Sequence, residues 1–229
     1  MSARLAILIS GRGSNMHSLI NAVQSDFNGQ YAGASVATVI SNNPHAGGLQ
    51  AANLAGIASE VVDHRKFIDR DSFDRELSRI IDAAAADWIL LAGFMRILGQ
   101  TFVNQYRGRL INIHPSLLPE YPGLNTHQRA ITAGDKFAGA SVHYVTEQLD
   151  GGPVILNARV AIEAQDDEDS LASRVLEKEH IIYPLALSWI LQDRIHLKTD
   201  ALGEDFCEWQ GERCLQPLQL HDLPDSAKS

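Results

Sequence analysis

The stretch LAILISGRGSNMHSLINAVQ, residues 5–24, shows the unit from which the first half of the chain is built. Five apolar residues, Leu5–Ile9, are typical of a buried strand. The glycine-containing segment SGRGSN, residues 10–15, then ends the apolar run, and Asn15–Gln24 fits a helix. A strand, a tight turn and a helix in this order predict the first part of a β-α-β unit.

The same alternation continues to about residue 114. Further strands are predicted at Ser35–Ile40, Ala58–Val62, Trp88–Leu91 and Leu110–Ile113, and further helices at Gly47–Leu54 and Phe73–Ala85. We expect Asp71 or Ser72 to cap the last of these helices. The pattern predicts an α/β fold with a Rossmann-like, mostly parallel sheet and helices on both faces. Ligands bind at the carboxyl ends of the strands in such sheets.

The pattern changes after residue 114. A proline- and glycine-rich loop leads to a helix from about Thr126, and two longer strands are predicted at Gly139–Val145 and Val154–Ile162. A helix is predicted at Ser170–Gln192. We expect a single domain over residues 1–200, with an N-terminal lobe of about 1–110 and a C-terminal lobe of about 111–200. Residues 201–229 are expected to form an extension that contains part of a hairpin and ends in mobile residues.

Composition and charge exclude several classes of protein. The 229 residues are 45% apolar and 21% charged, as in ordinary globular domains, and the net charge is −9. A chain with a net negative charge is not suited to binding nucleic acid or an anionic membrane, because like charges repel. Cys207 and Cys214 are the only cysteines, and no cysteine or histidine has zinc-type spacing. We therefore expect a cytoplasmic protein with no nucleic-acid partner, no membrane segment and no metal.

The loop of residues 10–15 is a candidate phosphate site. Glycines permit close backbone approach, and free N–H groups at a helix start attract an anion. The loop is neither a dinucleotide fingerprint, because Met16 stands where a third glycine belongs, nor a P-loop, because no Gly-Lys-Ser/Thr follows. A single phosphate group and a merely structural glycine-rich turn explain this loop equally well.

The stretch INIHPSLLP, residues 111–119, is a candidate for catalysis. Asn112 and His114 are two residues apart, so on a strand they project to the same side. An amide donor beside an imidazole suits a reaction that develops an oxyanion and moves a proton. Taken alone, the pair is better explained as a strand end whose polar groups are satisfied.

Two other loops contain candidate residues. Arg96 lies among apolar residues in AGFMRIL, residues 92–98, which suggests either a flat apolar ligand with a carboxylate or an arginine stem that covers apolar surface. Asp150 lies in TEQLDGGP, residues 146–153, and is explained as a turn residue unless the loop folds over His114. A carboxylate in that position orients an imidazole and stabilises its charged form.

Five segments in order decide between these interpretations: SGRGSN at 10–15, LAGFMRIL at 91–98, NIHPSLLPEYPGLNTH at 112–127, GASVHYVTEQLDGGPVI at 139–155, and the Glu-His pair at 179–180. Together they resemble the folate-dependent glycinamide ribonucleotide formyltransferase family of purine synthesis, from about residue 4 to residue 200. The resemblance implies the formyltransferase fold, with phosphate bound by the N-terminal lobe and folate binding and catalysis in the C-terminal lobe.

The resemblance also implies residue roles. Asn112 holds the oxyanion, His114 is the general acid or base, and Asp150 pairs with His114. Ser141 is expected to position Asp150 or a bound water. The ribonucleotide is assigned to Gly13, Ser14 and Asn15 at its phosphate and to Glu179 at its ribose. The folate is assigned to Arg70, Met95, Arg96, Ile97, Leu98, Asn112, Thr146, Glu147, Gln148, Leu149 and Asp150.

The activity implied is transfer of the formyl group of 10-formyltetrahydrofolate to the amine of glycinamide ribonucleotide, without a metal. Small-molecule substrates are then the expected partners, and the chain is expected to be a monomer or a homodimer. One alternative is another enzyme that uses formyltetrahydrofolate, either a deformylase or another formyltransferase. We expect a deformylase to carry a domain before Leu5, and a tRNA enzyme to carry a larger basic C-terminal domain. The other alternative is a non-catalytic nucleotide- or folate-binding module.

Overall fold

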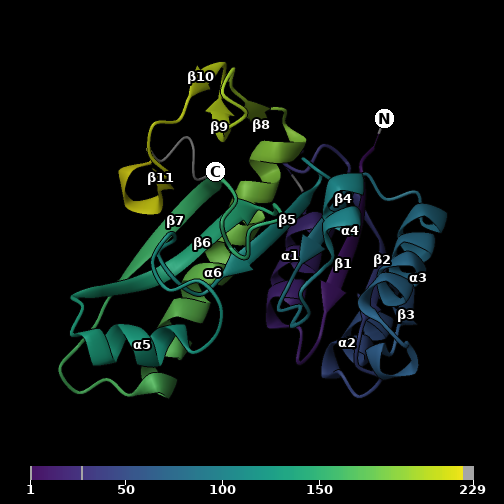
Figure 1. Cartoon of the computed structure of the whole chain (residues 1–229), viewed down its shortest axis with the longest axis horizontal. Coiled ribbons are helices and arrows are strands. Elements are labelled where there is room, and N and C mark those ends of the chain that lie inside the picture. Colours follow the sequence, from purple (N-terminus) through teal and green to yellow (C-terminus); the bar gives the residue numbers. More distant parts are fainter. Residues whose placement is uncertain (1, 27, 224–229) are drawn as a thin grey trace. The chain divides into compact units, whose positions relative to one another are not determined.

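The computed structural model describes residues 2–26 and 28–223 (Figure 1). The chain divides after Asn112 into unit 1, Met1–Asn112, and unit 2, Ile113–Ser229. The two units are described separately.

Unit 1 contains a parallel sheet. Its strands are β1 (Arg4–Ile9), β2 (Ser35–Ser41), β3 (Ser59–Val61), β4 (Trp88–Leu91) and β5 (Leu110–His114), whose last two residues belong to unit 2. Their order is β5-β4-β1-β2-β3, and every neighbouring pair is parallel. The predicted strands are confirmed, with bounds that differ by at most one residue at either end. Leu5–Ile9 are fully buried, as the apolar run predicted.

Four α-helices connect these strands: α1 (Ser14–Gln24), α2 (Gly47–Leu54), α3 (Arg70–Ala83) and α4 (Gln100–Gln105). A short 3-10 helix, η1 (His64–Lys66), precedes α3. Helix α1 contacts α2, and α3 contacts α4. From β1 the chain adds β2 and β3 on one side, and then returns to add β4 and β5 on the other side of β1. Because strand crossovers are right-handed, this reversal puts the pair α1 and α2 and the pair α3 and α4 on opposite faces of the sheet. The carboxyl ends of β1 and β4 therefore flank the switch point at which ligands bind in such sheets.

Helix α3 begins earlier than predicted. The expected cap at Asp71 or Ser72 is wrong, because the Asp69 carboxylate accepts a hydrogen bond from the Ser72 N–H at 2.7 Å and the helix starts at Arg70. The apolar periodicity that marks a helix starts only at Phe73, and the first turn is polar. Helix α4 was not predicted, since its six residues are too few to establish a helical period.

Unit 2 pairs β6 (Phe137–Tyr144) with β7 (Val154–Ala161) in antiparallel orientation. Both strands contact α6 (Glu168–Leu191), a long helix that starts with a capping box between Asp167 and Ser170. Helix α5 (Thr126–Ala133) contacts β6 and α6. The predictions for these four elements are confirmed, with bounds shifted by one or two residues. The short strand β11 (Leu218–Gln219) pairs with β7 in parallel.

The last part of unit 2 forms a separate antiparallel sheet of β8 (Ile195–Thr199), β9 (Asp205–Trp209) and β10 (Glu212–Arg213). The hairpin expected in this tail is present as β9 and β10. A 3-10 helix, η2 (Leu220–Asp222), follows β11. The mobility predicted for the last residues concerns 224–229, which lie outside the described residues. In the described part of the chain, no helix has both the length and the apolar composition that crossing a membrane requires.

Candidate active site

The loop after β1 leads directly into the start of α1. Gly13 has a φ of 78° and precedes the helix, so it takes a conformation that strains other residues. Ser14 and Asn15 form the first turn of α1, and that turn contains no acidic residue. Backbone N–H groups and the helix dipole favour an anion at a helix start, which is the physical basis of the predicted phosphate site.

Helix α2 packs closely against this loop. The Gly48 N–H donates to the Gly11 carbonyl at 3.1 Å. A Cβ on Gly48 would lie 2.5 Å from Ile9 Cδ1 and 3.3 Å from Gly13 Cα, so no larger residue fits without movement. The sequence analysis did not single out Gly48. The sequence could have indicated this close packing through the glycine pair at 47–48, which lies at the start of a predicted helix.

The loop after β4 exposes apolar side chains. Met95 and Ile97 are 69% and 57% exposed. Arg96 places Cζ 5.7 Å from the centroid of the Phe73 ring, and its Nε is buried with no hydrogen-bond partner among the described residues. Exposed apolar side chains beside a guanidinium fit a flat anionic ligand, and the position of Arg96 over the Phe73 ring also fits an arginine stem that covers apolar surface, so the ligand stays a prediction.

The far end of this loop is attached to α3. The Gly99 N–H donates to Asp74 Oδ2 at 2.7 Å, and Asp74 is only 6% exposed. Burial raises the pKa of Asp74 above its ordinary value. Arg70, which starts α3, passes close to Gly99: its Cδ lies 3.5 Å from the position that a Gly99 Cβ would occupy. Asp74 was not predicted as a site residue, because no sequence motif surrounds it.

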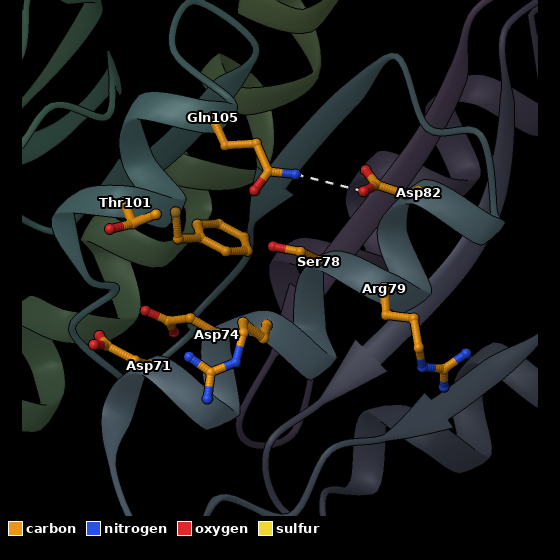
Figure 2. A pocket seen from close by; sticks show the side chains of 9 residues that line it. Asp71, Asp74, Ser78, Arg79, Asp82, Thr101 and Gln105 are labelled. Carbon is orange, nitrogen blue, oxygen red and sulfur yellow. Dashed lines mark hydrogen bonds between the residues drawn. The ribbon is translucent and has the colours of Figure 1, made fainter.

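A cavity of about 440 Å³ lies on the other side of this attachment, between α3 and α4 (Figure 2). Its lining includes Asp74, Ser78, Phe102 and Gln105, and the Gln105 amide donates to Asp82 at 3.4 Å. None of the predicted site residues lines this cavity. It is therefore distinct from the loops to which the sequence analysis assigned the substrates.

In unit 2, the loop of residues 146–150 meets His114. Asp150 Oδ2 lies 3.5 Å from His114 Nδ1 and accepts a hydrogen bond from the Gly123 N–H at 2.9 Å. His114 Nε2 lies 2.9 Å from the Tyr121 carbonyl oxygen, which can only accept. Both ring nitrogens thus face oxygen acceptors, which hold the His114 ring in one orientation. The loop folds over His114, which was the condition for Asp150 to be more than a turn residue.

The Asp150 loop has a constrained backbone. Asp150 has a φ of 49°, a left-handed conformation that Asp tolerates better than most residues. A Cβ on Gly152 would lie 1.9 Å from the Tyr144 carbonyl oxygen, so glycine is required there. Leu149 is 52% exposed at the loop tip. The structure places Thr146, Glu147 and Gln148 in the same loop, after β6.

His143 is a second imidazole near Asp150. Its Nε2 lies 3.8 Å from Asp150 Oδ1, and its Nδ1 donates to the Tyr144 carbonyl at 2.9 Å. The residue is 1% exposed, and burial lowers the pKa of His143 below its ordinary value. Asp150 is thus flanked by a neutral imidazole and by His114.

Three further predicted residues have defined positions. Asn112 lies two residues before His114 on β5 and is partly buried. Glu179 lies on α6 and is 7% exposed. The Ser141 hydroxyl donates to the Ser116 carbonyl at 2.6 Å and accepts from the Leu118 N–H at 3.0 Å. Both of these hydrogen bonds hold the proline-rich loop after His114, and the expectation that Ser141 positions Asp150 or a bound water stays a prediction.

Comparison with known proteins identifies the family. A model of the formyl transferase family matches residues 3–187. The phosphoribosylglycinamide formyltransferase of Escherichia coli (strain K12) is 48% identical over 201 residues, which are 88% of this chain and 93% of that protein. The chain belongs to the phosphoribosylglycinamide formyltransferase family.

Other members agree with this assignment. The structure of phosphoribosylglycinamide formyltransferase from Coxiella burnetii superposes with a TM-score of 0.87 at 41% identity, covering 96% of this chain and 99% of that chain. The trifunctional purine biosynthetic protein adenosine-3 of Homo sapiens is 38% identical over 195 residues, which are 85% of this chain and 19% of that protein. The family resemblance, the α/β fold and the formyltransferase class expected from the sequence are confirmed.

In the described part of the chain, no group of three or more histidine, cysteine, aspartate or glutamate residues is arranged to hold a metal ion.

Proposed function

We propose that this chain transfers the formyl group of 10-formyltetrahydrofolate to the amine of N1-(5-phospho-D-ribosyl)glycinamide. The products are formylglycinamide ribonucleotide and tetrahydrofolate, and the step belongs to de novo purine biosynthesis. The observation that carries the proposal is the contact between His114 and Asp150. His114 lies on β5, the strand that also contains Asn112, and the chain belongs to the phosphoribosylglycinamide formyltransferase family.

The reaction proceeds by direct transfer. The substrate amine attacks the formyl carbon, and the carbonyl electron pair moves to oxygen to give a tetrahedral oxyanion. The Asn112 amide donates a hydrogen bond to this oxyanion. The protonated His114 ring donates a second one through Nε2, which for this step exchanges the Tyr121 carbonyl for the substrate oxygen, while Nδ1 stays toward Asp150. The carbon–nitrogen bond to the folate then breaks, the folate nitrogen takes up a proton, and the amine loses one. No covalent enzyme intermediate is needed, and much of the rate comes from aligning two bound substrates.

Asp150 keeps His114 oriented and stabilises its charge. The carboxylate is fixed by the Gly123 N–H, so it does not have to reorganise when the imidazole exchanges a proton. Because Asp150 and His114 have side chains only 10% and 7% exposed, water screens their interaction weakly.

The substrates are assigned to different loops. The ribonucleotide phosphate binds at Gly13, Ser14 and Asn15, and its ribose contacts Glu179. The folate binds along residues 95–98, with Arg70 and the loop 146–150. In this proposal 10-formyltetrahydrofolate is a co-substrate, and the protein works in the cytoplasm as a monomer or a homodimer without a metal.

The test is formyl transfer by the purified full chain. The assay incubates it with 10-formyltetrahydrofolate and phosphoribosylglycinamide and detects the formylated ribonucleotide by mass spectrometry. We expect product with the wild-type chain, and a fall in kcat of roughly 10²–10⁴-fold for His114→Ala, the usual contribution of general acid–base catalysis. Folate binding by this variant, followed by calorimetry, serves as the control for folding.

Two results would count against the proposal. Release of formate without a formylated ribonucleotide would indicate a deformylase. Folate or nucleotide binding without any turnover of either substrate would indicate a binding module.

A further inference from the structure

Ser10 lies at the switch point of the unit 1 sheet and bonds to the loop after β4. It is the first residue after β1. Its N–H donates to the Gly93 carbonyl at 3.1 Å. Its hydroxyl accepts a hydrogen bond from the Met95 N–H at 2.7 Å. The loop that leads to Gly13–Asn15 is therefore joined, at its first residue, to the loop that contains residues 95–98.

The Ser10 hydroxyl is also held from the other side. It donates to Asn42 Oδ1 at 2.6 Å, and Asn42, which follows β2, is 4% exposed. His64 Nδ1 lies 3.0 Å from the Asn42 carbonyl oxygen. The Asn43 side-chain amide donates to the Ser10 carbonyl at 3.3 Å. Ser10 thus connects the ends of β2, β1 and β4.

We propose that Ser10 is a positioning residue that couples the ribonucleotide site to the folate site. This inference rests on the proposed function. The hydroxyl has one proton to donate and uses it toward Asn42, so its lone pair is aimed at the Met95 N–H. A folate that fixes residues 95–98 also fixes Ser10, and Ser10 begins the segment that presents Gly13–Asn15 to the phosphate. By thermodynamic linkage, each ligand then increases the affinity for the other by the same factor.

A purely structural role for Ser10 predicts a different outcome. Ser10→Ala would leave the Met95 N–H and the Asn42 amide oxygen without their partner, which costs stability whether or not the sites are coupled. Stability alone therefore cannot decide, whereas the mutual dependence of two ligand affinities can.

The experiment measures binding of tetrahydrofolate and of phosphoribosylglycinamide by calorimetry, each alone and each with the other saturating. This pair cannot react, since no formyl group is present. In the wild-type chain we expect each ligand to tighten the other by a factor within the usual range for coupled sites, about 5–150-fold. In Ser10→Ala the factor should fall to about 1, while each ligand alone binds within about threefold of wild type.

Three further variants complete the test. Ser10→Thr keeps the hydroxyl and should keep the coupling. Asn42→Ala removes the acceptor of the Ser10 hydroxyl, and we expect it to reduce the coupling factor. It keeps the inference testable if Ser10→Ala does not fold. Ser18→Ala is the matched control, because the Ser18 hydroxyl bonds within α1, to the Asn15 carbonyl at 2.9 Å, and not to the loop after β4.

Coupling that survives in both Ser10→Ala and Asn42→Ala, or that is absent from the wild-type chain, would overturn the inference. Loss of coupling in Ser18→Ala would overturn it as well. Failure of the proposed function is recognised separately, because the wild-type chain would then produce no formylated ribonucleotide in the turnover assay.

Discussion

Asp150 makes two contacts that a substitution can separate. Its Oδ2 accepts from the Gly123 N–H at 2.9 Å and lies 3.5 Å from His114 Nδ1. An asparagine in its place retains an oxygen for Gly123 but has no charge to stabilise a protonated ring. We expect Asp150→Asn to lower kcat by roughly 10²-fold with a small change in KM, because general acid–base help is usually worth about 10²–10⁴-fold.

The control for this substitution is Asp169→Asn, in the exposed first turn of α6, which should leave kcat unchanged. Steady-state kinetics with both substrates varied will separate kcat from KM. A kcat within twofold of wild type would mean that Asp150 serves only the turn.

His143 should make stability depend on pH. Burial lowers the pKa of His143 in the folded chain below the ordinary value of 6.5. Below about pH 6.5 the unfolded chain binds a proton that the folded chain does not, so the free energy of unfolding falls as the pH falls. The maximum slope from one such group is about 1.4 kcal/mol per pH unit.

We expect His143→Gln to flatten this slope between pH 6.5 and pH 5, measured by urea unfolding at a series of pH values. The slope will not vanish, because burial also lowers the pKa values of His127 and His180. An identical slope in variant and wild type would show that the His143 ring is protonated in the folded chain.

At the scale of elements, the close approach of α2 to the phosphate loop gives a matched pair of substitutions. A Cβ on Gly48 would lie 3.3 Å from Gly13 Cα and 3.3 Å from the Gly11 oxygen, whereas a Cβ on Gly47 would meet nothing closer than Arg12 Cα at 3.9 Å. Gly48→Ala should displace the loop and raise KM for the ribonucleotide by roughly tenfold, since overpacking typically costs about 1–3 kcal/mol.

Gly47→Ala should leave this KM unchanged and stabilise α2 slightly, because alanine favours the helix over glycine. KM for the folate should change little in either variant. If Gly48→Ala and Gly47→Ala changed KM for the ribonucleotide equally, the packing of α2 would not be what supports the phosphate loop.

Local signals decided which elements were predictable. The strands of unit 1 have continuous apolar runs such as Leu5–Ile9, bounded by glycine or polar residues, and they were predicted almost to the residue. Helix α3 was predicted late, because its cap at Asp69 precedes a polar first turn. Helix α4 has two buried apolar residues, Phe102 and Val103, and so no repeat from which a period can be seen.

The site was less predictable than the fold, because its contacts join distant residues. The resemblance selected His114 and Asp150, but residue spacing alone gave no reason for their side chains to meet. The hydrogen bonds of Ser10 to Met95 and of Asp74 to Gly99 join residues 85 and 25 positions apart. No periodicity or motif indicates such pairs, which become visible only when neighbouring strand ends are placed beside each other.

At the scale of the whole chain, we expect the tail after residue 200 to contribute to the stability of unit 2 and not to its chemistry. Trp209 on β9 packs against Trp189, which is fully buried, with ring centroids 4.6 Å apart, and Cys207 is 3% exposed. Strand β11, which follows the sheet of β8, β9 and β10 in the chain, pairs with β7 in parallel. None of the residues assigned to either substrate lies after residue 200.

Deleting residues 201–229 should therefore lower the melting temperature while formyl transfer at 25 °C remains within about tenfold of the full chain. Uncovering a large side chain such as Trp189 costs roughly 1.5–3 kcal/mol. For a chain of this length each kcal/mol corresponds to roughly 2–4 °C, so the loss is expected to be about 3–12 °C. Calorimetry of both chains, followed by the turnover assay below the lower transition, gives the comparison.

Pro153 and Val154 line a cavity of about 420 Å³ together with the tail, so the tail also borders the loop that carries Asp150. A truncated chain that is folded but inactive would show that this border holds Asp150 in place, and the tail would then have to be counted among the parts that position the catalytic carboxylate.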